Sequence, residues 1–153
     1  MRNTFDCFVK QPNQQALNVE QRGEVQMNTT APIEYIAAGN AQATSKELDL
    51  FAKHEDAKVR RRVAEHHNTP YELLLILVND EHPEVRLGVA NNPRATLALL
   101  QGLIEDVSVD VRFGLAENPL LPIKILTQLS KDENPYVASR ARTTLSRLLN
   151  EAA

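Results

Sequence analysis

The chain has one cysteine, no tryptophan and only five glycines among its 153 residues. A single thiol, Cys7, excludes an intramolecular disulfide and a cysteine-rich metal or cluster site, which is typical of a reducing compartment. Five glycines leave little room for a glycine-rich phosphate loop, and neither a G-x-S-x-G elbow nor an H-E-x-x-H motif is present. We therefore expect a protein that is not an enzyme and that carries no cofactor.

Long apolar runs are missing as well. The longest aliphatic run, 73–78, has six residues, whereas a helix that spans a bilayer needs about 20. The N-terminal segment has no continuous apolar core and does not resemble a secretory signal. With a net charge of −3, the chain has no overall attraction to nucleic acid or to an anionic membrane. These features predict a cytoplasmic protein without a membrane helix.

The chain does contain an internal repeat with a period of 26 residues. Lys-Val-Arg at 58–60 returns as Glu-Val-Arg at 84–86 and as Asp-Val-Arg at 110–112. In each copy an apolar residue and an alanine follow, then a polar turn rich in Asn and Pro, then a leucine-rich run. Apolar spacings of three and four within each half predict two short helices per copy.

Helix-start signals support this assignment. Pro83 and Pro135 suit the first position of a helix, and 69–72 reads as a capping box. Side chains that suit an N-cap stand at Asp56, His82, Ser108 and Asn134. The first helix of the unit 57–82, at about 57–66, is short enough for its end to tighten into a 3₁₀ turn. We expect Val59, Val63, Leu74 and Leu77 to be buried between neighbouring copies.

The sequence thus predicts an all-α protein built as a short solenoid of about four two-helix repeats. The predicted units are 31–56, 57–82, 83–108 and 109–134, followed by a longer, more polar cap helix within 135–153. Residues 1–30 are rich in Asn and Gln and lack the leucine periodicity, so we expect a flexible or loosely docked extension. Gly88 and Gly114 share one register and predict close helix packing.

The string DEHPEVRLGVANNP at 80–93 resembles the leucine-rich repeat variant family, a branch of the HEAT-like and armadillo-like superhelical repeats. The phrase returns at 106–119 and, with His66 and His67 in place of Asn-Pro, at 56–70. The resemblance covers 31–153 and implies a right-handed α-α superhelix in which some helices are 3₁₀. It implies no activity. The iron–sulfur cluster of one type of relative is not implied, because only Cys7 precedes the repeats.

Two charged columns repeat in phase through the copies, and they consist of Arg60, Arg86 and Arg112, and of Asp80, Asp106 and Asp132. Guanidiniums one repeat apart form a ladder at about 10 Å intervals, which suits phosphates or an acidic peptide. The interpretation that we favour is structural. Each arginine then pairs with an aspartate, and the pairs set the angle between repeats.

A second feature is a concentration of positive charge, which consists of Lys53, His54, Lys58, Arg60, Arg61, Arg62, His66 and His67. It suits an acidic partner or nucleic acid, or it is a solvated face. The position of Arg61 is taken by Leu87 and Phe113 in later copies. The candidate partner-binding residues are Arg60, Arg61, Arg62, Leu87 and Phe113. Adjacent histidines are expected to diverge, so we predict no metal site.

We favour a non-catalytic interaction or scaffold module that binds a protein or peptide along the superhelix, with a monomer as the default. One alternative is a nucleic-acid-binding HEAT-like protein, although the absence of tryptophan and the negative net charge argue against a base-binding groove. The other alternative is an accessory subunit of an enzyme system. The sequence does not identify the partner.

Overall fold

The computed structural model describes residues 30–151, and in this range the chain forms nine helices and no strand. The prediction of an all-α protein is confirmed. The expected N-terminal extension, including Cys7, lies outside the described residues except for Thr30, where the first helix begins. The helices are α1 (Thr30–Ala38), α2 (Ser45–Phe51), α3 (Ala57–Glu65), α4 (Tyr71–Leu77), α5 (Pro83–Ala90), α6 (Leu97–Leu103), α7 (Val109–Glu117), α8 (Ile123–Leu129) and α9 (Pro135–Glu151).

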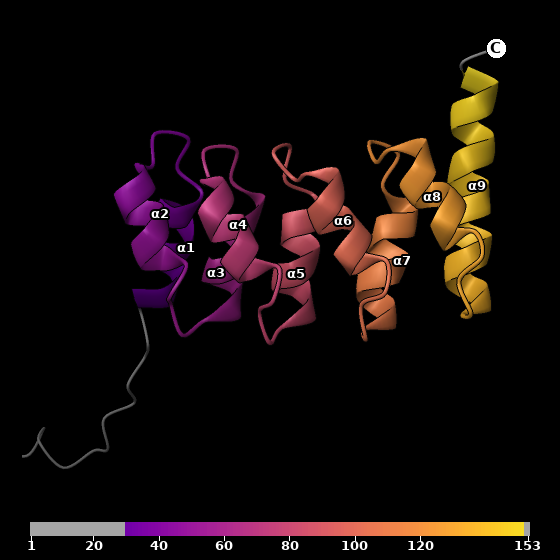
Figure 1. Cartoon of the computed structure of the whole chain (residues 1–153). Coiled ribbons are helices and arrows are strands. Elements are labelled where there is room, and N and C mark those ends of the chain that lie inside the picture. Colours follow the sequence, from indigo (N-terminus) through magenta and orange to yellow (C-terminus); the bar gives the residue numbers. More distant parts are fainter. Residues whose placement is uncertain (1–29, 152–153) are drawn as a thin grey trace, which may run out of the picture.

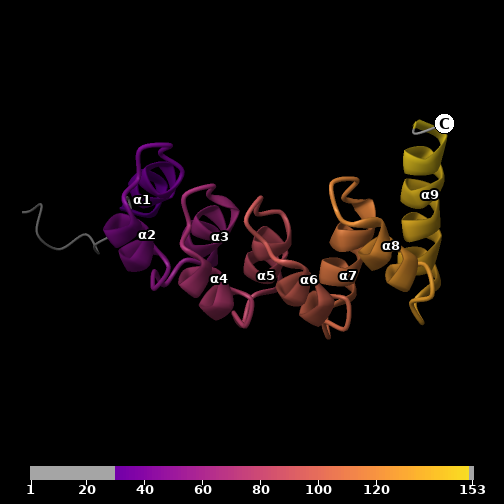
Figure 2. The ribbon, with the colours of Figure 1, turned by 45° about the horizontal axis from the view of Figure 1, so that its top comes forward.

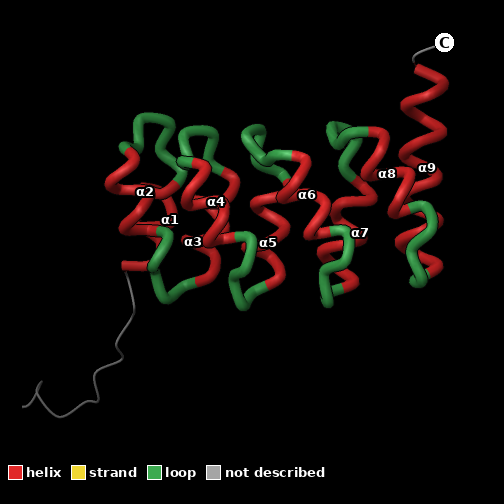
Figure 3. Tube along the Cα trace, viewed as in Figure 1, coloured by secondary structure: helices red, strands yellow, loops and turns green. Residues whose placement is uncertain are grey.

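The helices stand in two rows, with the odd-numbered helices in one row and the even-numbered helices in the other (Figure 1). Short loops join successive helices, alternately at the top and at the bottom of the stack in the view of Figure 3. Each pair α3–α4, α5–α6 and α7–α8 occupies one predicted unit, and α9 is the expected long closing helix. The repeat in the sequence is therefore a repeat of helix pairs.

Asp56, His82 and Ser108 are N-cap residues as predicted, but the side chains of His82 and Ser108 make no capping hydrogen bond. The side chain of Asp56 accepts a hydrogen bond from the Lys58 backbone N–H at 2.8 Å, and this caps α3. Pro83 and Pro135 are the first residues of α5 and α9. Proline costs nothing there, because the first N–H groups of a helix have no partner inside it.

The capping box predicted at 69–72 is wrong. Pro70 is the N-cap of α4, and the hydroxyl of Thr69 donates to the Val63 carbonyl at 2.5 Å. Thr69 is fully buried in the loop between α3 and α4, so its hydroxyl must be satisfied by a nearby carbonyl. A capping box does form at the start of α2, between Thr44 and Glu47.

The expectation of 3₁₀ helices is not met between residues 30 and 151. At the helix ends, 3₁₀ geometry is limited to single hydrogen bonds from an N–H to the carbonyl three residues earlier. The His66 N–H, for example, donates to the Val63 carbonyl at 3.0 Å and closes α3. One such bond satisfies an orphan carbonyl at the helix end without a full turn of the less favourable geometry.

The buried apolar residues form two core clusters, one toward each end of the stack, and Val78 packs against both. Val59, Val63, Leu74 and Leu77 are buried, as predicted. Each buried aliphatic side chain contributes about 1.5–3 kcal/mol. Helices of seven to nine residues, such as α3 and α4, are marginal in isolation. The stack therefore owes its stability to this packing.

The odd-numbered helices pack directly against one another, α1 on α3, α3 on α5, α5 on α7 and α7 on α9, whereas successive even-numbered helices have no contact of similar extent. In Figure 2 the row is curved, and the odd-numbered helices lie on the inner side. We call the exposed surface of these helices the inner face. A Cβ on Gly88 would lie 3.0 Å from Ala64 Cβ, so glycine permits the close approach of α3 and α5.

Candidate partner-binding surface

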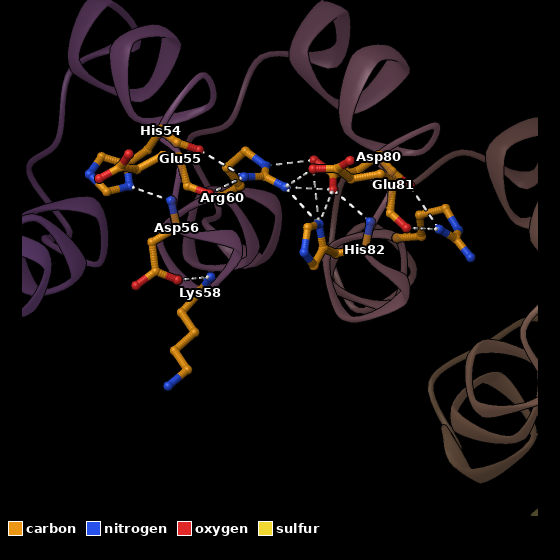
Figure 4. Close-up of polar contacts among 9 residues, drawn as sticks. His54, Glu55, Asp56, Lys58, Arg60, Asp80, Glu81 and His82 are labelled. Carbon is orange, nitrogen blue, oxygen red and sulfur yellow. Dashed lines mark hydrogen bonds and ion pairs between the residues drawn. The ribbon is translucent and has the colours of Figure 1, made fainter.

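The arginine and aspartate columns are joined as rungs of a ladder. Arg60 donates from Nε to Asp80 Oδ2 at 2.7 Å and from Nη2 to Oδ1 at 2.9 Å, and Figure 4 shows this fork. Two more rungs repeat it, Arg86 with Asp106 and Arg112 with Asp132. Each rung joins residues 20 positions apart and so links one repeat to the next.

The same guanidinium also holds the turn before its own helix. Nη1 of Arg60 donates to the carbonyls of His54 and Glu55 at 2.8 and 2.9 Å, and Nη2 also contacts His82 Nδ1 at 3.0 Å. All five N–H groups of Arg60 therefore have partners, and the residue is 8% exposed. The guanidinium of Arg60 is committed to the ladder, so the inner-face surface described below does not include it.

The aspartates of the ladder also organise the turns. Asp80 Oδ1 accepts the His82 backbone N–H at 2.9 Å, and Asp106 Oδ1 accepts the Ser108 N–H at 2.8 Å. Burial by itself raises the pKa of both carboxyls. The arginine and backbone hydrogen bonds outweigh burial, so the pKa of Asp80 and the pKa of Asp106 lie below the ordinary value. Both groups are held as carboxylates.

A fourth rung was missed in the sequence. Glu34 stands in the arginine column and His54 in the aspartate column, again 20 residues apart. The Asp56 N–H donates to His54 Nδ1 at 3.0 Å, so Nε2 carries the ring proton and donates to Glu34 Oε2 at 2.6 Å. The sequence contains a signal for this rung, because the 26-residue period places Glu34 in the same column as Arg60.

A second polar ladder crosses the repeats at the opposite helix ends, and the sequence pattern did not predict it. The buried amide of Asn92 donates to the Ala64 and His66 carbonyls at 2.6 and 2.9 Å. His66 makes the equivalent contact with the Asn40 carbonyl at 2.9 Å, and Thr144 with the Ala116 carbonyl at 2.7 Å.

The predicted divergence of His66 and His67 is wrong. Their rings stack, with centroids 4.6 Å apart, because His66 is held by the second ladder and the chain turns directly after it. Among residues 30–151, no group of three or more His, Cys, Asp or Glu side chains has an arrangement that would hold a metal ion.

The two ladders decide which cations of the basic cluster remain available. Arg60, His54 and His66 belong to the ladders, and Lys53 pairs with Asp49 at 2.7 Å. Three cations of α3 remain on the inner face, and they line a pocket of about 340 Å³ together with Tyr35 of α1 and Glu65. These cations are Lys58, Arg61 and Arg62.

The three cations differ in which groups lie against their positive charge. Arg61 donates from Nε to Glu65 Oε1 at 2.8 Å, and this bond raises the pKa of Arg61 despite partial burial. The guanidinium carbon of Arg62 lies 5.3 Å from the centroid of the Tyr35 ring, a cation–π distance. Arg62 Nε is buried and has no hydrogen-bond partner within the described residues. Lys58 and Arg62 form no ion pair there either.

Farther along the inner face the same register is apolar. Leu87 is half-buried and leans over Gly114, where a Cβ would lie 2.7 Å from Leu87 Cδ1. Leu87, Gly114 and the exposed Leu120 line a second pocket of about 460 Å³ between α5 and α7. Phe113 has the same register on α7 and is half-buried against the core. Four candidate residues, Arg61, Arg62, Leu87 and Phe113, thus belong to the inner-face helices.

No family model, curated protein or solved structure matches this chain. None of the helices between residues 30 and 151 has the length and apolar character needed to cross a membrane.

Proposed function

We propose that the protein is a non-catalytic interaction module that binds a partner protein or peptide on its inner face. One observation carries this proposal. Each ladder column keeps one residue type, arginine or aspartate, through three successive repeats, whereas the inner-face column changes from Tyr35 to Arg61, Leu87 and Phe113. Residues of this column lie on the inner-face helices and differ in each repeat, so they are suited to contact different parts of a ligand.

The charge of the inner face favours a protein over a nucleic acid. Lys58 has its counterparts in Glu84 of α5 and Asp110 of α7, one and two periods later. A path along the face therefore runs from positive to negative charge, and a continuous phosphate backbone would be repelled over its second half. Nucleic-acid binding remains the alternative hypothesis, and an accessory role in an enzyme system is compatible with the same surface.

We also infer that the curved row belongs to a right-handed superhelix of the leucine-rich repeat variant type, and that the protein acts in the cytoplasm as a monomer. The family inference is supported by the phrase that recurs at 56–70, 80–93 and 106–119. The cellular location is supported by the low cysteine content.

Capture of partners by the tagged full-length chain from its source cell tests the function. The inner-face variant is Lys58→Glu/Arg61→Glu, because both side chains are exposed and outside the ladders. Lys124→Glu/Lys131→Glu makes the same change of charge at exposed positions in and after α8, in the other row. Each capture is run with and without nuclease.

A protein that is retained with nuclease, lost with the inner-face variant and kept with the α8 variant supports the proposal. Material that disappears on nuclease treatment indicates nucleic-acid binding instead. A partner that both variants retain places the binding surface elsewhere and rejects the inner face.

A further inference from the structure

The two pockets of the inner face differ in chemistry. The pocket between α1 and α3 contains three cations and one carboxylate, Glu65, which is already paired with Arg61. Lys58 and Arg62 are therefore available for a negative charge. The pocket between α5 and α7 has Leu87, Gly114 and Leu120 in its lining. Its carboxylate, Glu117, is paired with Arg140 at 2.7 Å, so this end is suited to an apolar group.

The distance between the pockets follows from the packing of the row. They are separated by two helix-to-helix steps, which amount to about 16–20 Å at usual interaxial distances. An extended segment of polyproline II type advances about 3.1 Å per residue and presents every third side chain to the same side. Its repeat of about 9.3 Å matches one step of the row. Six residues of such a segment span the two pockets.

The geometry points to an extended partner segment that carries one carboxylate and one apolar side chain about six residues apart. The carboxylate binds Lys58 and Arg62, and the apolar side chain enters the pocket beside Leu87 and Leu120. This inference rests on the proposed function and specifies its ligand.

The charges between the pockets limit how acidic the segment is. Glu84 of α5 and Asp110 of α7 form no ion pair with another described residue. They lie one and two repeats after Lys58, in the same register. A segment with one acidic residue therefore binds better than a polyacidic segment, for which the middle of the path is repulsive.

Fluorescence polarisation with labelled synthetic peptides tests the inference on the full chain. The peptides carry one glutamate and one leucine in a Ser/Pro background, in both orders, with separations from roughly two to fourteen residues. We expect the affinity to peak near a separation of six. A helical ligand would instead need about eleven to thirteen residues for the same span, because a helix rises only 1.5 Å per residue.

Single substitutions test which pocket binds the carboxylate and which binds the apolar side chain. Arg62→Gln is expected to weaken the best peptide about tenfold, as for loss of one charge-assisted hydrogen bond, and to leave the matched Glu→Gln peptide unaffected. Leu120→Ser, at an exposed position that does not threaten folding, is expected to weaken it about tenfold through lost apolar burial. Lys124→Gln in α8 serves as the control and should leave the affinity unchanged.

An affinity that does not depend on separation, that peaks at the helical distance, or that is insensitive to Arg62→Gln or to Leu120→Ser overturns the inference. Stronger binding of a polyglutamate peptide or an oligonucleotide also overturns it. If the cellular partner is still lost with Lys58→Glu/Arg61→Glu while no peptide binds, the interaction function stands and only the extended ligand is rejected.

Discussion

His54 donates from Nε2 to the carboxylate of Glu34 over 2.6 Å, across the same 20 positions that separate Arg60 from Asp80. The pair is a rung of the ladder in which the acid and the base have exchanged columns. The geometry that one repeat offers the next therefore accepts either polarity, provided that a donor faces an acceptor.

Reversal of the first rung should restore it. Glu34→Arg and His54→Asp are each expected to destabilise the fold by about 1–2 kcal/mol, because they oppose two bases or two acids. The double variant matches the rung of Arg60 with Asp80 and should recover most of the loss, a coupling of about 1–3 kcal/mol. Denaturant unfolding of the four proteins measures this coupling. Additive losses in the double variant would contradict the rung.

The stability of the ladder depends on the paired hydrogen bonds of each arginine as well as on its charge. Arg86→Lys removes the paired bonds to Asp106, at 2.7 and 2.8 Å, and the bond to the Asp80 carbonyl at 2.7 Å. We expect a loss of about 2–4 kcal/mol. Arg147→Lys, in an exposed pair with Glu151 at 3.9 Å, is the control and should change stability by less than about 0.5 kcal/mol. Equal effects at the two sites would show that charge alone is sufficient.

The ladder carboxylates predict acid sensitivity. The pKa of Asp80 and the pKa of Asp106 are lowered by folding from 3.8, so their contribution to stability is complete above that value and is lost as the pH falls through the lower folded values. We expect the free energy of unfolding to decline below about pH 4. Asp80→Asn/Asp106→Asn should be less stable than the unaltered protein at neutral pH. Its free energy of unfolding should also fall less steeply as the pH decreases. Urea titrations across this range provide the measurement, and an unchanged slope in the variant would exclude these two groups as its source.

The second ladder depends on a buried amide. Asn92→Ala removes the donor to the Ala64 and His66 carbonyls and is expected to cost about 2–3 kcal/mol. Asn92→Asp should cost more at neutral pH, because it brings a carboxylate against two carbonyl oxygens. Asn118→Ala is the matched control. Asn118 Oδ1 accepts the Leu120 N–H at 2.9 Å, as Asn92 Oδ1 accepts the Arg94 N–H at 2.8 Å, but the Asn118 NH₂ group donates only to the exposed side chain of Asn91 at 3.1 Å. Thermal unfolding should rank Asn118→Ala as the mildest of the three; any other order would refute this role for Asn92.

Two helix glycines should respond oppositely to alanine. A Cβ added at Gly102 would meet no atom within 4 Å, so Gly102→Ala should stabilise α6 by about 0.5–1 kcal/mol. Gly88→Ala should destabilise the fold, because its Cβ would lie 3.0 Å from Ala64 Cβ and 3.2 Å from the Arg61 carbonyl oxygen. Melting temperatures test the pair. A gain at both positions would mean that α3 and α5 separate without cost.

Features set by local chemistry could be read directly from the sequence. The period of 26 residues, the helix starts at Asp56, Pro83 and Pro135 and the closing helix follow from apolar spacing and capping, which act over a few residues. The rungs from Arg60 to Asp80 and their repeats also followed, because two columns of opposite charge recur in phase. A repeat reveals pairs that are far apart in the sequence, because the same two residue types recur at the same separation in each copy.

Contacts that depend on how one repeat is set against the next were decided by the tertiary structure alone. Arg60, Arg61 and Arg62 are adjacent in sequence, yet the first is enclosed in the ladder and the other two line the inner face. Asn92 looked like a helix breaker and proved to be a buried link to residues 26 and 28 positions earlier. Sequence determined the helices and their order. Only the distance and angle between packed helices decided which polar groups are buried, and therefore which remain free to bind a partner.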